Sequence, residues 1–105
     1  MELTVLWTRF AENKLEDIYN YYKKEVGLNL ASKMITNIID STISLKHSPR
    51  IGQIEHLLAQ RKQEFRYLIV KNYKVIYWIE EDKRQIKIAN VFDCRQNPIK
   101  LSETI

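Results

Sequence analysis

The sequence predicts an α+β domain in which a hairpin of two helices packs on a mainly antiparallel, twisted sheet. Three observations carry this prediction. Apolar residues recur at helical spacing through most of the first half of the chain. From residue 65 onward, apolar and polar residues alternate with the period of two that is typical of strands. The chain holds only two glycines and two prolines, which favours regular elements joined by tight connections.

The first elements follow from the start of the chain. Leu3, Val5 and Trp7 alternate with their neighbours and predict a short strand. Thr8 can then cap a helix, because its side-chain oxygen can accept a hydrogen bond from a free backbone N–H of the first turn. The apolar stripe of this helix comprises Leu15, Ile18, Tyr19, Tyr22 and Val26. We expect Gly27 to end the helix, since glycine adopts the left-handed conformation without steric cost.

A second helix is predicted from about Asn29 to Lys46. Its apolar stripe comprises Ala31, Met34 or Ile35, Ile38, Thr42 and Leu45. Pro49 and Gly52 then stop the helix, because proline restricts the residue before it and glycine permits a sharp turn. Only about two or three residues separate the two helices, so we expect an antiparallel helical hairpin.

Three strands are predicted in the second half of the chain, at residues 65–70, 73–79 and 86–92. Short turns join them into an antiparallel meander, residues 53–58 add a short strand at an edge, and the first strand pairs within the same sheet. Because the helical hairpin covers one face of the sheet, we expect the other face to be open. That open face is expected to carry Arg66, Lys74 and Trp78.

The length and charge of the chain limit its organisation and partners. Residues 1–105 are expected to form a single domain, since compact domains of this size are common. The 17 Lys and Arg against 13 Asp and Glu give a net charge of +4. Basic and acidic groups cancel over residues 1–46, so the whole excess lies in residues 47–105. A basic half indicates an anionic partner, either nucleic acid or an acidic protein segment, and simple solubility is the alternative.

Membrane, metal and disulfide chemistry are not predicted. No segment approaches the roughly 18 consecutive apolar residues of a membrane span, and the first ten residues lack a secretory pattern. We therefore expect a cytoplasmic protein with no membrane partner. Cys94 is the single cysteine, and His47 and His56 lack the spacing of a metal pair, so no metal or cofactor is expected. Asp93 is expected to pair with Arg95 or to cap the final turn.

Four segments, in their order along the chain, resemble the RelE/ParE superfamily of bacterial type II toxin–antitoxin toxins. The resemblance rests on Trp7 before a helix containing LEDIYNYY, LKHSPRIG at residues 45–52, FRYLIVKNYKVIYWI at residues 65–79, and VFDCRQNP at residues 91–98. It covers nearly the whole chain. It implies the superfamily fold and a cognate antitoxin that wraps an extended, partly disordered segment around the toxin. It also implies toxin–antitoxin complexes of higher order.

The resemblance implies two different activities. RelE-like members are ribosome-dependent mRNA endoribonucleases (mRNA interferases), whereas ParE-like members are associated with inhibition of DNA gyrase and with plasmid stabilisation. If this chain were a nuclease, Arg66, Lys74 and Arg95 would stabilise the phosphate. Compared with RelE-like toxins, Leu68 replaces a further basic residue, and the terminal His-Tyr or Tyr that such a nuclease would use as acid or base has no equivalent. The sequence therefore favours a ParE-like protein that acts by binding gyrase or another target. A degenerate, non-toxic relative is a further alternative.

The residues expected to contact a partner are Arg61, Lys62, Arg66, Lys74, Trp78 and Arg95. Trp78 beside Lys74 and Arg66 would form an aromatic and cationic platform for an antitoxin chain or a target. Arg61 and Lys62 belong to a basic loop, for which simple solvation is the alternative. An acidic antitoxin segment is the expected occupant of the basic sheet face, and whether RNA also binds there is left open.

Overall fold

The computed structural model describes residues 2–104. Its strands and helices follow the predicted order. They are β1 (Thr4–Trp7), α1 (Arg9–Glu25), α2 (Leu28–Ile43), β2 (Gln53–Ile54), β3 (Arg66–Val70), β4 (Tyr73–Glu80) and β5 (Gln85–Asp93). Short 3₁₀ helices lie between and after them, namely η1 (Ser44–Lys46), η2 (His56–Leu58), η3 (Glu81–Lys83) and η4 (Pro98–Glu103).

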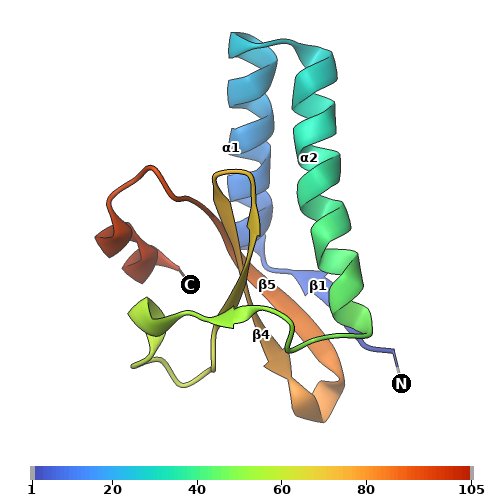
Figure 1. The fold of residues 1–105 in the computed structure, drawn as a ribbon, viewed down its shortest axis with the longest axis vertical. Helices are drawn as coiled ribbons and strands as arrows, with labels where there is room; N and C mark the ends of the chain where they lie inside the picture. Colours follow the sequence, from blue (N-terminus) through green and yellow to red (C-terminus); the bar gives the residue numbers. More distant parts are fainter. Residues whose placement is uncertain (1, 105) are drawn as a thin grey trace.

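The helical hairpin forms as the sequence predicts (Figure 1). Thr8 caps α1, because its Oγ1 accepts a hydrogen bond from the backbone N–H of Ala11 at 3.2 Å. Gly27 follows α1 with a φ of +127°, a conformation that favours glycine. The last turn of the predicted second helix tightens into η1. The tight link at Gly27 makes α2 run back antiparallel to α1.

The five strands form one mixed sheet in the order β1-β5-β4-β3-β2. β1 pairs parallel to β5, and the remaining neighbours pair antiparallel, which confirms the predicted α+β fold. Only the first two residues of the predicted 53–58 strand pair, and residues 56–58 form η2 instead. A bulge in β5 leaves Ala89 between the partners of Ile76 and Tyr77.

The two helices cover one face of the sheet and enclose the larger core. Its buried residues are Ala11, Ile18, Ile38, Leu45, Tyr73, Val75, Tyr77, Ile86, Ile88 and Val91. The predicted stripes of both helices therefore pack against this core as the helical periodicity predicts, except at Val26, which follows the end of α1 and is 52% exposed. No helix of residues 2–104 combines the length and the apolar character needed to cross a membrane.

The opposite face of the sheet is not open, so that expectation was wrong. After β5 the chain folds back beside the sheet (Figure 1), and η2 and η4 pack against each other there. They close a second core of Leu58, Phe65, Ile76, Ala89, Phe92 and Leu101. The Nδ2 of buried Asn90 donates to Oγ1 of Thr104 at 2.8 Å and fixes the end of this segment. The physical reason is that β4 and β5 carry apolar side chains on both faces, and both need cover.

Candidate functional site

Lys74 and Glu55 form a largely buried ion pair on the face of the sheet opposite the helices. The Nζ of Lys74 donates to Oε2 of Glu55 at 2.7 Å, and the Glu55 side chain is only 3% exposed. The other carboxylate oxygen accepts from the backbone N–H of Leu57 at 3.1 Å. The Lys74 ammonium also lies 4.4 Å from the ring centroid of Tyr67. The charge of Lys74 is therefore already neutralised within the fold.

Arg66 does not share a face with Lys74, contrary to the prediction. It lies directly opposite Tyr77 in the register of β3 and β4, and Tyr77 belongs to the core under the helices. Tyr67, the next residue, packs with the second core instead. The alternation of β3 was assigned to the wrong faces because this strand is apolar on both sides. The burial of Phe65 in the second core fixes the true assignment.

The Arg66 guanidinium holds the loop that follows α2. Its Nη1 donates to the carbonyl of Gly52 at 2.9 Å and to that of Arg50 at 3.3 Å, and its Nη2 lies 3.1 Å from Oε1 of Glu64. The side chain is 17% exposed. These hydrogen bonds occupy most of the N–H donors of the guanidinium. Arg66 therefore has a structural role, and a phosphate would have to compete with these bonds.

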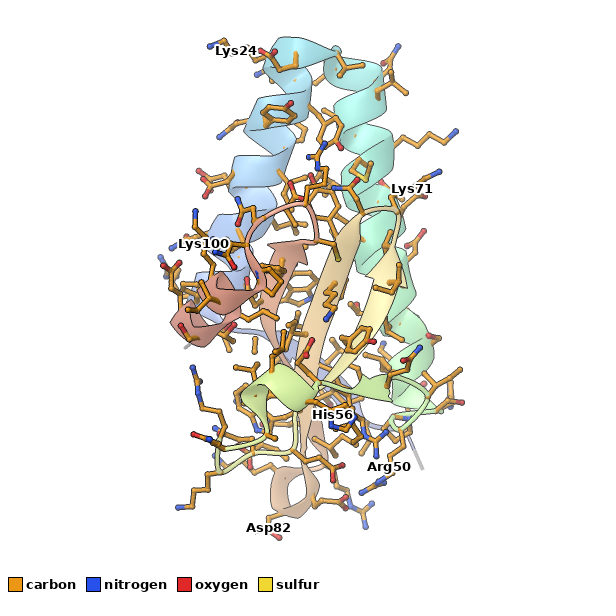
Figure 2. The ribbon with its side chains drawn as sticks, turned by 60° about the vertical axis from the view of Figure 1, so that its left-hand side comes forward. Lys24, Arg50, His56, Lys71, Asp82 and Lys100 are labelled. Carbon is orange, nitrogen blue, oxygen red and sulfur yellow. The ribbon has the colours of Figure 1, made fainter. Side chains whose placement is uncertain are left out.

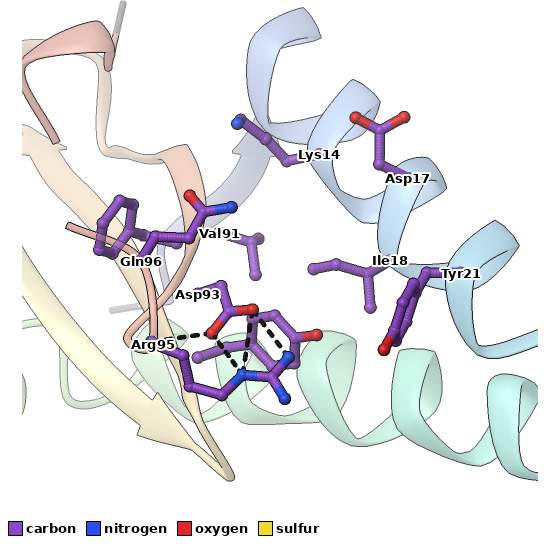
Figure 3. Close-up of a pocket in the computed structure, with 10 residues that line it drawn as sticks. Lys14, Asp17, Ile18, Tyr21, Val91, Asp93, Arg95 and Gln96 are labelled. Atoms are coloured by element: carbon purple, nitrogen blue, oxygen red, sulfur yellow. Dashed lines mark hydrogen bonds and ion pairs between the residues drawn. The ribbon is translucent and has the colours of Figure 1, made fainter. Parts of the chain in front are cut away.

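Arg95 folds back on Asp93 at the end of β5 (Figure 3). Its Nε lies 3.0 Å from Oδ1 and its Nη2 lies 2.8 Å from Oδ2, so the predicted pair forms with bidentate geometry. These hydrogen bonds lower the pKa of Asp93 and raise that of Arg95. The pair lines a pocket of about 390 Å³ that Lys14 and Asp17 of α1 also line. This pocket is therefore lined by charges of both signs.

Trp78 packs against the second core, and the basic loop is tied to the end of the chain. The Trp78 ring meets that of Phe65 edge-on with centroids 5.6 Å apart, and its Nε1 donates to Oε1 of Glu80 at 3.3 Å. The Nη2 of Arg61 donates to the carbonyl of Ser102 at 2.8 Å and so ties the loop to η4. Lys62 is exposed and lines a hollow beside Trp78. The structure does not bring Arg66 into a platform with Trp78 and Lys74.

The positive charge is distributed over separate parts of the surface. Figure 2 shows Lys24 at the tip of the helical hairpin, Arg50 after α2, Lys71 at the turn between β3 and β4, and Lys100 on η4. Among residues 2–104 no three His, Cys, Asp or Glu side chains are grouped to hold a metal ion. Burial raises the pKa of the Cys94 thiol, which disfavours a reactive thiolate.

Glu55 is the residue that the sequence interpretation missed. It was assigned to a strand without a role, yet it is buried and pairs with a lysine 19 residues away. A signal was present, because Glu55 stands beside Ile54 in a segment that continues with Leu57 and Leu58. An acidic side chain that is buried together with its apolar neighbours needs a cation or a hydrogen-bond donor as a partner.

The family model described as the ParE toxin of the type II toxin–antitoxin system parDE matches residues 5–98. The chain belongs to the ParE toxin family. A chain of the chromosomal ParDE toxin–antitoxin system from P. aeruginosa has a similar fold, with a TM-score of 0.72 and 19% identity over 88% of this ParE-family toxin and 96% of that chain.

A second solved structure has a fold similar to that of this ParE-family toxin. A chain of the RelBE2 toxin–antitoxin complex from Mycobacterium tuberculosis has a TM-score of 0.63 and 14% identity, covering 89% of the toxin and 92% of that chain. No curated protein sequence gave a significant match. At these identities the structural likeness concerns the fold, so the activity has to be argued from the site.

Proposed function

We propose that this ParE-family toxin acts by binding a protein target, with DNA gyrase as the first candidate, and that it does not cleave RNA. The observation that carries the proposal is the separation of the three cations that a nuclease would need. Arg66 lies on the helix side of the sheet, Lys74 lies on the opposite side, and Arg95 lies beyond the end of β5. Cleavage of a phosphodiester requires such groups to converge on one phosphate.

The bonding of these cations supports the same proposal. Lys74 is paired with Glu55, Arg95 is paired with Asp93, and Arg66 is bound to loop carbonyls and Glu64. At each of these positions a phosphate would compete with a carboxylate, and at Lys74 it would leave the buried Glu55 unpaired, which is the costly case because Glu55 is only 3% exposed. Binding of a folded protein needs no such convergence, because contacts can be spread over an interface of the usual size.

A cognate antitoxin is the proposed regulator. The family model describes the toxin of a type II toxin–antitoxin system, and the similar structures also come from toxin–antitoxin systems. We propose that the antitoxin of this chain neutralises it by direct binding, in complexes that can contain several copies of each protein. Because DNA gyrase acts in the cytoplasm, the proposed target implies that the toxin also acts there.

RNA cleavage remains the second candidate because of the Glu55–Lys74 pair. The Glu55 carboxylate, 2.7 Å from the Lys74 ammonium, would supply the base that the sequence analysis did not find, beside a cation that it did. The 3% exposure of Glu55 opposes this role, since the carboxylate would have to be uncovered to reach a 2′-hydroxyl. The pair is therefore the place to test the alternative.

One experiment separates these functions. The chain is induced without an antitoxin, and transcript cleavage on ribosomes is followed together with plasmid supercoiling. Loss of supercoiling with intact transcripts is the expected result. Transcript cuts that disappear with Glu55→Gln but persist with the exposed control Glu103→Gln would support the nuclease instead. Normal growth at full expression would identify a non-toxic relative.

A further inference from the structure

The tip of the helical hairpin extends past the end of the sheet (Figure 1). Tyr22 of α1 and Met34 of α2 are the residues nearest the tip whose side chains pack against the larger core. Between them the backbone turns tightly, since the N–H groups of Val26 and Gly27 both donate to the carbonyl of Tyr22, at 2.8 and 2.9 Å. The tip, defined as residues 23–33, is therefore held by its own hydrogen bonds and not by the sheet.

The tip exposes three large apolar side chains close together. Val26, Leu28 and Leu30 are 52, 55 and 53% exposed. Single exposed apolar residues are common, but three within five positions form a patch whose burial on a partner would be favourable. Val26 and Leu30 also line a hollow of about 210 Å³ together with Tyr22 and Met34. The hollow offers an apolar place in which one side chain of a partner can be buried.

The charge around this patch is positive. Lys23, Lys24 and Lys33 outnumber Glu25 within the tip, and Lys71, on the turn after β3, lines the same hollow (Figure 2). Within residues 2–104, none of these lysines forms an ion pair. Lys23 and Lys24 complement the dipole at the end of α1, but this does not account for Lys33 and Lys71. An acidic partner would be attracted here, whereas a second copy of this chain would be repelled by its own lysines.

The geometry of the tip also selects the form of the partner. Residues 23–33 belong to two helices and the link between them, so they present no strand edge to which an extended segment can add. An amphipathic helix needs no such edge, because its backbone bonds are already made and it binds through side chains three and four residues apart. A nucleic acid would use the lysines and leave Val26, Leu28 and Leu30 exposed.

We propose that the tip of the hairpin binds an acidic amphipathic helix of a partner protein. The apolar stripe of that helix covers Val26, Leu28 and Leu30, and one of its side chains enters the hollow. Glu or Asp residues beside the stripe meet Lys33 and Lys71. Under the proposed function, on which this clause rests, the helix belongs to the protein target of the toxin. The tip then provides the surface on which the target docks.

The test uses the purified full chain and three labelled peptides of about 18 residues, long enough to form a helix. The first peptide has leucines at i, i+3, i+4 and i+7 with glutamates beside them. The second has glutamines in place of the leucines, and the third has lysines in place of the glutamates. Fluorescence anisotropy of the label measures binding. We expect only the first peptide to bind with a measurable affinity, and this affinity to fall as salt is added.

A substitution at the tip tests the apolar contact. Leu30→Gln should weaken binding of the first peptide about tenfold, the usual effect of truncating the apolar centre of an interface. Glutamine is a good helix former, so this variant should keep its fold, which circular dichroism checks. Ile43→Gln is the matched control, because Ile43 is 50% exposed at the other end of α2. This control should bind the first peptide as the parent does.

Two lysines of the hollow test the charge requirement. Lys33→Gln and Lys71→Gln should each weaken binding of the first peptide roughly two- to fivefold at low salt. Lys100→Gln is the control, because Lys100 is exposed on η4, away from the tip (Figure 2). It should leave the affinity unchanged. Parental affinity in both Lys33→Gln and Lys71→Gln would contradict the charge complementarity.

Other results would overturn the proposal by assigning the tip to a different occupant. Equal affinity for the first two peptides would show that the apolar patch is not the contact. A DNA duplex or anionic lipid vesicles that bind the parent but not Leu30→Gln, with no binding of the first peptide, would assign the tip to a nucleic acid or a membrane. A dimer in sedimentation that Leu30→Gln dissociates would assign it to a second copy of the chain.

The supercoiling assay separates this proposal from the proposed function. We expect Leu30→Gln to lose most of its effect on plasmid supercoiling and Ile43→Gln to keep it. A parent chain that binds the first peptide but leaves supercoiling intact would refute the gyrase target and leave the binding site at the tip standing. A Leu30→Gln variant as active as the parent would refute docking of the target at the tip and leave the proposed function standing.

Discussion

The phenol of Tyr77 and the backbone of Gly52 are in direct contact where the sheet meets the loop after α2. The Gly52 N–H donates to the Tyr77 hydroxyl at 3.0 Å, and that hydroxyl donates to the carbonyl of Pro49 at 2.7 Å. A Cβ at residue 52 would lie 2.5 Å from the phenol oxygen and 2.8 Å from the Tyr67 carbonyl. Glycine is thus required here by the close approach of a fully buried side chain.

We therefore expect Gly52→Ala to destabilise the fold by about 1–3 kcal/mol, the usual cost of overpacking a close contact. The measurement is the free energy of unfolding from urea denaturation. The effect should be coupled to residue 77, because Tyr77→Phe removes the phenol oxygen that the new methyl group meets. A Gly52→Ala protein as stable as the parent would contradict the close packing of this loop.

Tyr77→Phe on its own should also destabilise the protein. It leaves the Gly52 N–H and the Pro49 carbonyl without their hydrogen-bond partner, at a cost of about 1–3 kcal/mol. Hydrogen exchange should become faster at the Gly52 amide and remain unchanged in the centre of α1. Tyr21→Phe is the matched control, because Tyr21 is exposed. Equal losses of stability in the two variants would refute a specific role of the Tyr77 hydroxyl.

Removing one member of the Glu55–Lys74 pair should lower the free energy of unfolding strongly, whereas replacing both members should lower it much less. Lys74→Met leaves a carboxylate that is 3% exposed without its cation, and we expect a loss of about 3 kcal/mol. Adding Glu55→Gln should recover much of this loss, since a neutral amide is less costly to bury than an unpaired charge. A double-mutant cycle in urea denaturation measures the coupling. Additive losses in the cycle would mean that the pair is not coupled in solution.

The Asp93–Arg95 pair predicts a dependence of stability on acid. Its hydrogen bonds lower the pKa of Asp93 in the folded state, so its contribution is present above the unfolded pKa of about 3.9. That contribution is lost as the pH falls through the lower folded pKa. Asp93→Asn should therefore reduce stability at pH 7 and change it little at the lowest pH. Denaturation at both pH values provides the measurement, with exposed Asp40→Asn as the control.

Periodicity made most of the fold predictable, but it did not determine which face each strand residue occupies. The helices could be predicted because apolar residues recur at helical spacing through them, as at Ile18 and Ile38, although α2 also carries exposed apolar residues such as Ile43. The assignment of β3 failed because Tyr67 and Leu68 are both apolar, so alternation gave no preferred face. The sheet face opposite the helices is covered by a segment in which Leu101 is buried, and no local sequence pattern predicts this packing.

In the candidate site, contacts between residues close in the sequence could be predicted, and contacts between distant segments could not. Asp93 and Arg95 are two residues apart, so their pairing could be foreseen from the sequence. Glu55 and Lys74 come from segments that the sheet brings together, so their contact could not be read from spacing. A hollow lined by Trp7, Leu15 and Ile39 likewise joins residues of β1, α1 and α2, which only the assembled layers bring together.

The pairing of β1 with β5 also constrains how a newly made chain reaches its native state. Thr8 bonds to Ile88, a residue 80 positions further along the chain. The helical hairpin is therefore synthesised well before the central strands that bury its apolar stripe. Contacts between such distant segments slow folding, because a long loop must close before they are gained. Until then the nascent hairpin exposes the surface on which chaperones and proteases act.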